Sequence, residues 1–323
     1  MQKSADTSAP EHNAGGGHQP VMLDQVIDLL LQSHPEQKSL TGTIVDGTTG
    51  AGGHSLALLK HLEPNGSLLC FDRDPAALTM ASRRMGEDSR VTTIQSSYAD
   101  LARHCAPETV SAALLDLGLS TDQLNSERGF AFRRDTPLDM RFDPAGSVTA
   151  AGIVNHYTIE KLRDIFFQYG EEPLSPRIAR RIAEKRSEEK IETSSQLLAV
   201  IREAVPERFY TKTAARIFQA LRIAVNDEIE HFENGLIAAW EALRIGGVLC
   251  VISYHSIEDR RMKRFVAEMV KGCTCPPQIP ICVCGKVPTA RKLTKSALRP
   301  TGKEMRLNPR SRSARLRAAM KIA

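Results

Sequence analysis

The first third of the chain alternates short apolar runs with helical stripes of apolar residues. The runs have the length and composition of buried strands, and amphipathic patterns separate them. We expect strands at 43–46, 68–72, 91–95 and 112–116 and helices at 53–62, 75–85 and 99–104. This alternation predicts an α/β fold with a doubly wound parallel sheet, whose ligands bind at the carboxyl ends of the strands.

The pattern changes after Gln123. Residues 124–145 are rich in Arg, Asp, Gly and Pro without periodicity, and short helical patterns follow to about residue 212. Residues 214–242 then predict one long helix or two, before another buried strand and helix. We therefore expect a leader at 1–17, a doubly wound domain at 18–123 and 213–272, an inserted helical domain at 124–212, and a separate C-terminal segment at 273–323.

The first predicted strand runs into a glycine-rich turn, Asp-Gly-Thr-Thr-Gly-Ala-Gly-Gly-His, at residues 46–54. Gly50, Gly52 and Gly53 permit positive φ and close approach of the backbone to a ligand. Asp72 ends the next strand, 20 residues after Gly52. A carboxylate at this position can accept hydrogen bonds from both ribose hydroxyls. The spacing predicts a nucleoside-cofactor site.

The turn opens with an acid, Asp46, and lacks the G-x-G-x-x-G pattern of dinucleotide sites. A carboxylate there would repel a pyrophosphate and attract a cation, which favours S-adenosylmethionine, a sulfonium compound without phosphate. Two alternatives remain open at this point. One is a nicotinamide-dependent oxidoreductase, and the other is a glycine-rich turn without a ligand.

Charge is unevenly distributed. The net charge is +5, but residues 286–323 carry 12 Lys or Arg and one acid, whereas the rest of the chain carries −6. A basic segment on an acidic body predicts a polyanionic partner such as RNA or DNA. The arginines lie closest together at 306, 310, 312, 315 and 317. The alternative is a solvated tail that serves solubility.

Four of the seven cysteines, Cys273, Cys275, Cys282 and Cys284, fall within 12 residues. This density raises a zinc hypothesis, although C-x-C pairs differ from the usual zinc-knuckle spacing. We assign no metal and leave thiols on a Pro-rich loop as the favoured interpretation. No stretch of the sequence reaches the roughly 18–20 consecutive apolar residues that a membrane span needs. Residues 1–18 lack the apolar core of a signal peptide, so we expect a cytoplasmic protein.

Three further segments contain unusual polar motifs. They are Asp-Leu-Gly-Leu-Ser-Thr-Asp-Gln at 116–123, Arg-Gly-Phe at 128–130 with Pro-Leu-Asp-Met-Arg at 137–141, and Ser-Tyr-His-Ser-Ile-Glu-Asp-Arg at 253–260. With these motifs the chain resembles the bacterial MraW/RsmH family from about His18 to its end. It departs from the usual family pattern at Ala51, Tyr98, Thr121 and Tyr254.

The resemblance implies a methyltransferase that transfers a methyl group from S-adenosylmethionine to N4 of a cytidine in 16S ribosomal RNA of the small subunit. It also implies a Rossmann-like domain with an inserted helical domain that recognises RNA. The implied cofactor contacts are Gly52, Gly53, His54, Asp72, Tyr98, Asp116 and Gln123. It leaves open whether the protein is a monomer or a homodimer.

The reaction would be an in-line attack of the exocyclic amine on the sulfonium methyl. Our hypothesis is that Asp116, or a group such as Ser253 or His255, accepts the amine proton, although a lone histidine at a strand end is more often structural. The aromatic residues Phe130 and Phe132 and the guanidinium of Arg141 either contact the RNA or anchor the insert. A non-catalytic RNA-binding assembly factor is the alternative function.

Overall fold

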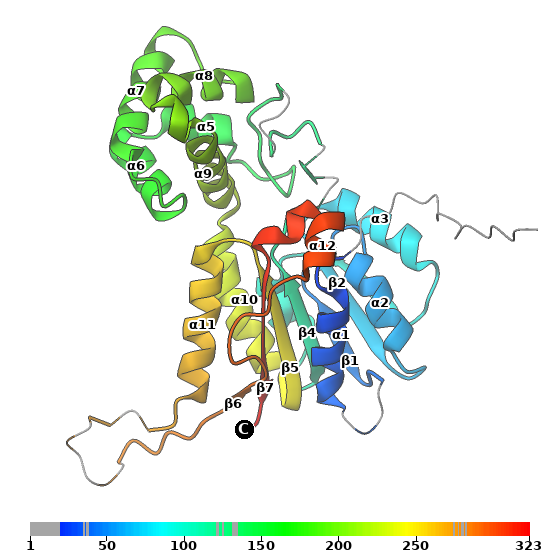
Figure 1. Cartoon of the computed structure of the whole chain (residues 1–323). Coiled ribbons are helices and arrows are strands. Elements are labelled where there is room, and N and C mark those ends of the chain that lie inside the picture. The colour runs from blue at the N-terminus through cyan, green and yellow to red at the C-terminus, as the bar shows by residue number, and fades with distance from the viewer. Residues whose placement is uncertain are drawn as a thin grey trace, which may run out of the picture.

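The structure is a computed structural model that describes residues 20–34, 36, 39–120, 123–124, 126–130, 135–273, 275–276, 278, 281 and 283–323 (Figure 1). The predicted leader, 1–17, lies outside the described residues, as do Thr121, Phe132 and Cys282.

The described residues form a seven-stranded sheet in the order β3-β2-β1-β4-β5-β7-β6. The strands are β1 Thr43–Asp46, β2 Ser67–Asp72, β3 Val91–Gln95, β4 Val110–Asp116, β5 Leu243–Ser253, β6 Ala290–Lys292 and β7 Arg315–Lys321. Neighbouring strands from β3 to β5 are parallel, and β7 pairs with β5 in the antiparallel direction. The prediction of a doubly wound α/β sheet is confirmed.

Helices cover both faces of the sheet, because successive strand residues point to opposite sides. Ile44 packs with α1 and α2 on one face, whereas Val45 packs with α10 on the other. The elements around the sheet are α1 Leu23–Leu30, η1 Leu31–Ser33, α2 Gly53–His61, α3 Pro75–Met85, the 3-10 helix η2 Tyr98–Arg103, α10 Glu228–Ala242 and α11 Ser256–Val270. Across the residues that are described, we find no helix with the length and apolarity to cross a membrane.

The helical insert has its own hydrophobic core and lies above the carboxyl ends of the strands (Figure 1). Its helices are α5 Ala150–His156, α6 Ile159–Gln168, α7 Ser175–Glu188, α8 Ser194–Ala204 and α9 Glu207–Asn226. The expected boundary at residue 212 falls inside α9, whose Ile217 and Leu221 pack in the insert core. Asp227, with φ of 48°, separates α9 from α10, so the region at 214–242 belongs to two helices.

The C-terminal segment is not a separate, solvated tail. After α12 Gly302–Leu307 and η3 Pro309–Ser313 it returns as β7, inserted between β5 and β6. Arg315 and Arg317 lie 2.9 and 2.7 Å from the carboxylate of Asp259 in α11. The carboxylate of Asp259 therefore offsets part of their charge within the fold. The sequence does not reveal this strand, because Arg315, Arg317 and Lys321 leave it no continuous apolar run and no regular alternation.

Candidate functional site

The larger of two neighbouring cavities opens at the carboxyl ends of β1 to β4 and encloses about 740 Å3 of empty space, including part of its mouth. The turn after β1, the ends of β2 and β3, the segment after β4, α10 and α11 all contribute to it. Its lining consists of Gly47, Thr48, Gly50, Asp72, Arg73, Ser96, Ser97, Tyr98, Asp116, Leu117, Gly118, Ser120, Gln123, Phe142, Glu228, His231, Phe232 and Glu258.

Asp72, the last residue of β2, lies in this lining at the position expected for a ribose acceptor. Its carboxylate accepts backbone N–H bonds from Gly50 at 2.8 Å and from Asp74 at 2.9 Å. A carboxylate has about four acceptor sites, so two remain for ligand hydroxyls. Burial raises the pKa of Asp72 to about 6, which leaves the carboxyl ionised at neutral pH.

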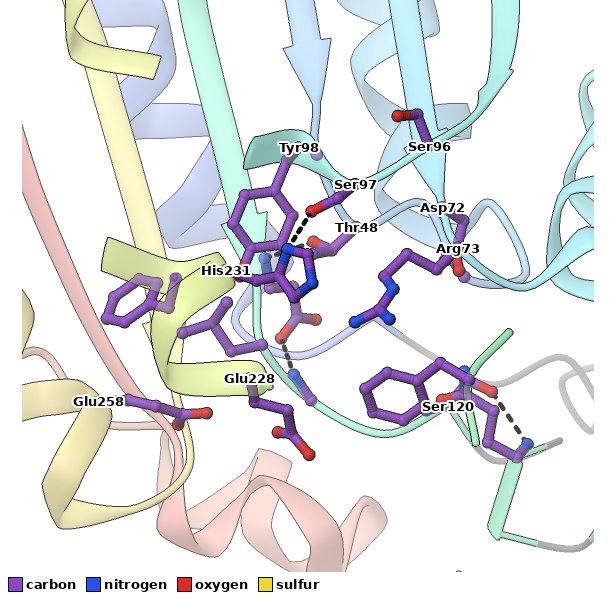
Figure 2. Close-up of a pocket in the computed structure, with 18 residues that line it drawn as sticks. Thr48, Asp72, Arg73, Ser96, Ser97, Tyr98, Ser120, Glu228, His231 and Glu258 are labelled. Atoms are coloured by element: carbon purple, nitrogen blue, oxygen red, sulfur yellow. Dashed lines mark hydrogen bonds between the residues drawn. The ribbon is translucent and has the colours of Figure 1, made fainter. Parts of the chain in front are cut away.

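Tyr98 forms an aromatic wall of the larger cavity (Figure 2). Its ring lies against Gly47 and against Gly235 of α10, where an added Cβ would overlap the ring. Burial raises the pKa of its hydroxyl above the ordinary value. Ser97 beside it contacts Nδ1 of His231 at 3.1 Å and so joins the end of β3 to α10. This wall provides a flat apolar surface suited to an adenine ring.

The larger cavity is acidic. Among the described residues, its lining contains four carboxylates and one guanidinium. Asp116 comes from the end of β4. Asp72 comes from the end of β2, and Glu228 and Glu258 come from α10 and α11 (Figure 2). Glu228 is paired at 2.7 Å with Arg222. This charge suits a sulfonium with an ammonium group and disfavours a pyrophosphate, so the residues present fit S-adenosylmethionine.

Asp46 does not supply this charge, contrary to the expectation from sequence. Its side chain is 1% exposed and does not face either cavity. It accepts bonds from Ser55 Oγ at 2.6 Å and from the N–H of Thr48 at 3.2 Å. Burial raises the pKa of its carboxyl. Asp46 fixes the turn, and the electrostatic preference that we attributed to it comes from other carboxylates.

The smaller cavity adjoins the larger one and encloses about 650 Å3. The two share Thr48, Gly50, Asp116, Gly118 and Ser120. Its other lining residues are Pro20, Val21, Thr49, Ala51, Gly53, His54, Arg84, Leu119, Tyr254 and Arg310. It therefore carries two arginines, where the larger cavity has mainly acids.

Asp116, the last residue of β4, stands in the shared wall. Its backbone N–H donates to Thr48 Oγ1 at 2.6 Å, and one carboxylate oxygen accepts from the N–H of Gly118 at 3.3 Å. His54 Nδ1 lies 3.6 Å from the other oxygen. The hydroxyl of Tyr254 also bonds this carboxylate, and burial together with that negative charge raises the pKa of Tyr254. Asp116 is thus held from several sides while it faces both cavities.

The three predicted cofactor contacts in the glycine turn do not line the same cavity. Gly53 and His54 line the smaller cavity, and Gly52 lines neither cavity. Gly52 has φ of 78°, and a Cβ there would lie 3.0 Å from Ala81 of α3, so its role is close helix packing. His54 is 7% exposed, with Nε2 3.0 Å from the carbonyl oxygen of Val21.

Gln123 lines the larger cavity and closes the segment that follows β4. Its Oε1 accepts from the N–H of Ser120, and its own N–H donates to Ser120 Oγ, both at 3.0 Å. Gln123 therefore shapes the segment that carries the shared lining residues.

His255 and Ser253 lie behind the cavity wall and line neither cavity. His255 caps α11, where its Nδ1 accepts from the N–H of Glu258 at 3.4 Å. Its Nε2 lies 3.0 Å from a carboxylate oxygen of Glu258. Ser253 is 2% exposed and its hydroxyl donates to the carbonyl of Arg315 at 3.4 Å. These three contacts hold the end of β5 and the start of α11 in position.

Phe130 and Arg141 have the contacts of anchoring residues. Phe130 is 7% exposed in the insert core and stacks on Phe142, with ring centroids 5.5 Å apart. Arg141 pairs with Asp139 at 2.6 Å and donates to the carbonyl of Gly146 at 2.7 Å. The contacts of these two residues favour the anchoring interpretation over RNA contact.

Several residues that line the larger cavity carry little local signal in the sequence. Ser96 and Ser97 directly follow β3, so their position at a strand end was a usable signal. Glu258 belongs to the motif at 253–260, but we did not single it out. Glu228 and His231 come from a helix without a recognisable motif, and only the packing of α10 beside η2 brings them into the cavity.

The comparisons with known proteins agree with the geometry. The MraW methylase family matches residues 16–322. Ribosomal RNA small subunit methyltransferase H of Heliobacterium modesticaldum is 43% identical over 314 residues, which cover 94% of this chain and 98% of the relative. The protein of the same name from Thermomicrobium roseum is 45% identical over 313 residues, covering 95% and 94%. A putative rRNA-methylase structure from Clostridium thermocellum, 12% identical with a TM-score of 0.41, covers 93% of this chain and 95% of its own and is too distant to support an argument. On the family match, the chain belongs to the MraW methylase family and is an S-adenosylmethionine-dependent methyltransferase.

Proposed function

We propose that the protein methylates the exocyclic N4 of a cytidine in the decoding region of 16S ribosomal RNA, acting in the cytoplasm on the small ribosomal subunit. The names of the relatives support a substrate in small-subunit ribosomal RNA. The observation that carries the proposal is Asp116, which lies in the wall common to an acidic cavity and a cavity bordered by arginines. Two ligands of opposite charge can meet at its carboxylate.

The cofactor would occupy the larger cavity. Asp72 would accept hydrogen bonds from the ribose hydroxyls and Tyr98 would lie beside the adenine, while Glu258 would offset part of the positive charge of the cofactor. The target cytosine, unstacked from its neighbours, would occupy the smaller cavity. Arg84 and Arg310 line that cavity and are exposed, so they can contact the flanking phosphates.

S-adenosylmethionine supplies a methyl group already activated by its sulfonium. The amine of cytosine is a poor nucleophile, because its lone pair is delocalised into the ring. Asp116 would accept a hydrogen bond from this amine and turn its lone pair toward the methyl carbon. The N–C bond forms as the S–C bond breaks, and the amine then gives its proton to Asp116 or to water.

Neighbouring groups hold the carboxylate of Asp116 in position to contact the amine. The N–H of Gly118 and the hydroxyl of Tyr254 orient the carboxylate, and His54 approaches its second oxygen. His255 and Ser253 would act indirectly, by holding the strand end and helix cap beside the site. We therefore assign proton acceptance to Asp116 in preference to these two residues.

The experiment that tests the proposal is methyl transfer to small subunits purified from a strain that lacks this gene. With methyl-labelled S-adenosylmethionine, we expect label in 16S RNA and N4-methylcytidine after nucleoside digestion. Subunits from the parent strain are the control and should accept almost no label. Label confined to DNA or protein, or on another atom of the RNA, would contradict the proposal. No transfer at all would favour a non-catalytic assembly factor.

A further inference from the structure

The segment that joins α11 to β6 is described at residues 271–273, 275–276, 278, 281 and 283–289, and these residues project from the body of the protein, on the side away from the helical insert (Figure 1). None of these described residues lines either cavity. Ile281 and Val283 are 75% and 76% exposed, so burial of these two side chains does not organise the segment. Three of its cysteines nevertheless converge, which requires another explanation.

The sulfur atoms of Cys273, Cys275 and Cys284 all lie within 4.8 Å of one another. The Sγ atoms of Cys273 and Cys284 are 3.9 Å apart. Thiolates bound tetrahedrally to zinc at about 2.3 Å stand about 3.8 Å from each other. A disulfide would need about 2.05 Å. The spacing therefore matches ligands around a common ion.

Backbone N–H groups hold two of these sulfurs in place. The N–H of Cys275 donates to Sγ of Cys273, and the N–H of Val283 donates to Sγ of Cys275, both at 3.4 Å. Gly285 has φ of 60°, which permits a tight turn directly after Cys284. Both features suit sulfur ligands held by a short peptide loop.

We propose that Cys273, Cys275 and Cys284 bind a zinc ion that closes the segment between α11 and β6. Thiolates select zinc among the available divalent ions, and binding would release the thiol protons. Three ligands leave the fourth tetrahedral position for another donor. The ion would be structural, and the proposal is independent of the proposed methylation.

The test is the metal content of the full-length, tag-free protein, purified with zinc under reducing conditions. By inductively coupled plasma mass spectrometry, we expect close to one zinc ion per chain. In the Cys273→Ser and Cys284→Ser variants, the zinc content per chain should fall at least about tenfold, because each variant lacks a direct ligand. Cys105→Ser, which removes a half-buried thiol elsewhere, should keep it.

Retained S-adenosylmethionine binding would show that the variants are folded, so that loss of zinc is specific. Three results would overturn the proposal. They are a wild-type protein that holds no zinc, cysteine variants that keep it, and iron in place of zinc. Thiol alkylation gives a second, independent readout: zinc should slow labelling of Cys273 and Cys284, and equal labelling with and without zinc would also contradict the site.

Discussion

The two cavities differ in charge although they share a wall. The larger one is lined by four carboxylates and aromatic side chains, and the smaller one is bordered by Arg84 and Arg310. Under the proposed function, this difference would keep a cationic cofactor apart from a polyanionic substrate. Asp116 is the charged side chain common to the two lining sets. Changes in one cavity should therefore affect one ligand, whereas changes at Asp116 should affect the reaction between them.

The largest effect is expected for Asp116→Asn. The amide keeps the size of the side chain but cannot accept the amine proton, so we expect kcat to fall by about 100- to 1,000-fold. Calorimetric titration should show that S-adenosylmethionine affinity changes much less. A loss of cofactor affinity as large as the loss of kcat would place Asp116 in cofactor binding alone.

Asp72→Asn should affect only the larger cavity. Loss of hydrogen bonds to a charged acceptor costs about 1.5–3 kcal/mol, so the Kd for S-adenosylmethionine should rise by about 10- to 100-fold. The KM for small subunits should change little at saturating cofactor. If both constants rose together, the separation between the two cavities would be wrong.

The carboxylate of Asp72 should also make cofactor affinity depend on pH. Because burial raises the pKa of Asp72 to about 6, the acceptor is ionised above that pH and protonated below it. Cofactor affinity should therefore fall as the pH drops from 7 to 5, by up to about tenfold per unit once the pH is below the pKa. The Asp72→Asn variant should lack this dependence. Parallel curves for the two proteins would assign the titration to another group.

Arg84→Ala tests the smaller cavity. Loss of one phosphate contact should raise the KM for small subunits by roughly fivefold and reduce the salt dependence of binding by about one charge. Arg83→Ala is a matched control, because Arg83 is also exposed on α3 but does not line the cavity. Equal effects of the two variants would indicate a diffuse charge contribution instead of a contact at the cavity.

Tyr254→Phe should have the smallest effect. It removes the hydroxyl that bonds Asp116 but keeps the ring that packs on Gly118. One orienting hydrogen bond contributes about 1 kcal/mol, so kcat should fall by about three- to fivefold with cofactor affinity unchanged. A decrease as large as that of Asp116→Asn would make Tyr254 itself essential to proton transfer.

The sequence predicted the parts of the fold that local pattern determines. The first four strands of the parallel sheet follow from apolar runs, and the turn between Asp46 and Asp72 follows from glycines and strand ends. Strand β7 could not be predicted in this way. This seven-residue stretch forms a strand because it pairs with β5 and because its arginines contact Asp259. Long-range pairing of this kind leaves no local signal.

The candidate site shows the same limit. Asp72, Tyr98 and Asp116 line the larger cavity, as expected for residues at or just beyond strand ends. Gly52 instead packs against Ala81, and Asp46 accepts a hydrogen bond from Ser55. The sequence does not reveal these contacts. The unusual polar residues at 253–260 singled out the motif that contains His255. The sequence could not show that the imidazole ring caps a helix behind the wall, because that depends on the path of α11.

The most direct test of the account is a crystal structure with S-adenosylhomocysteine. We predict that the ribose lies on the carboxylate of Asp72 and the adenine beside Tyr98, with the sulfur facing Asp116 and the smaller cavity left open. Density for the cofactor beside His54 and Arg84, with the larger cavity empty, would contradict the assignment of the two cavities.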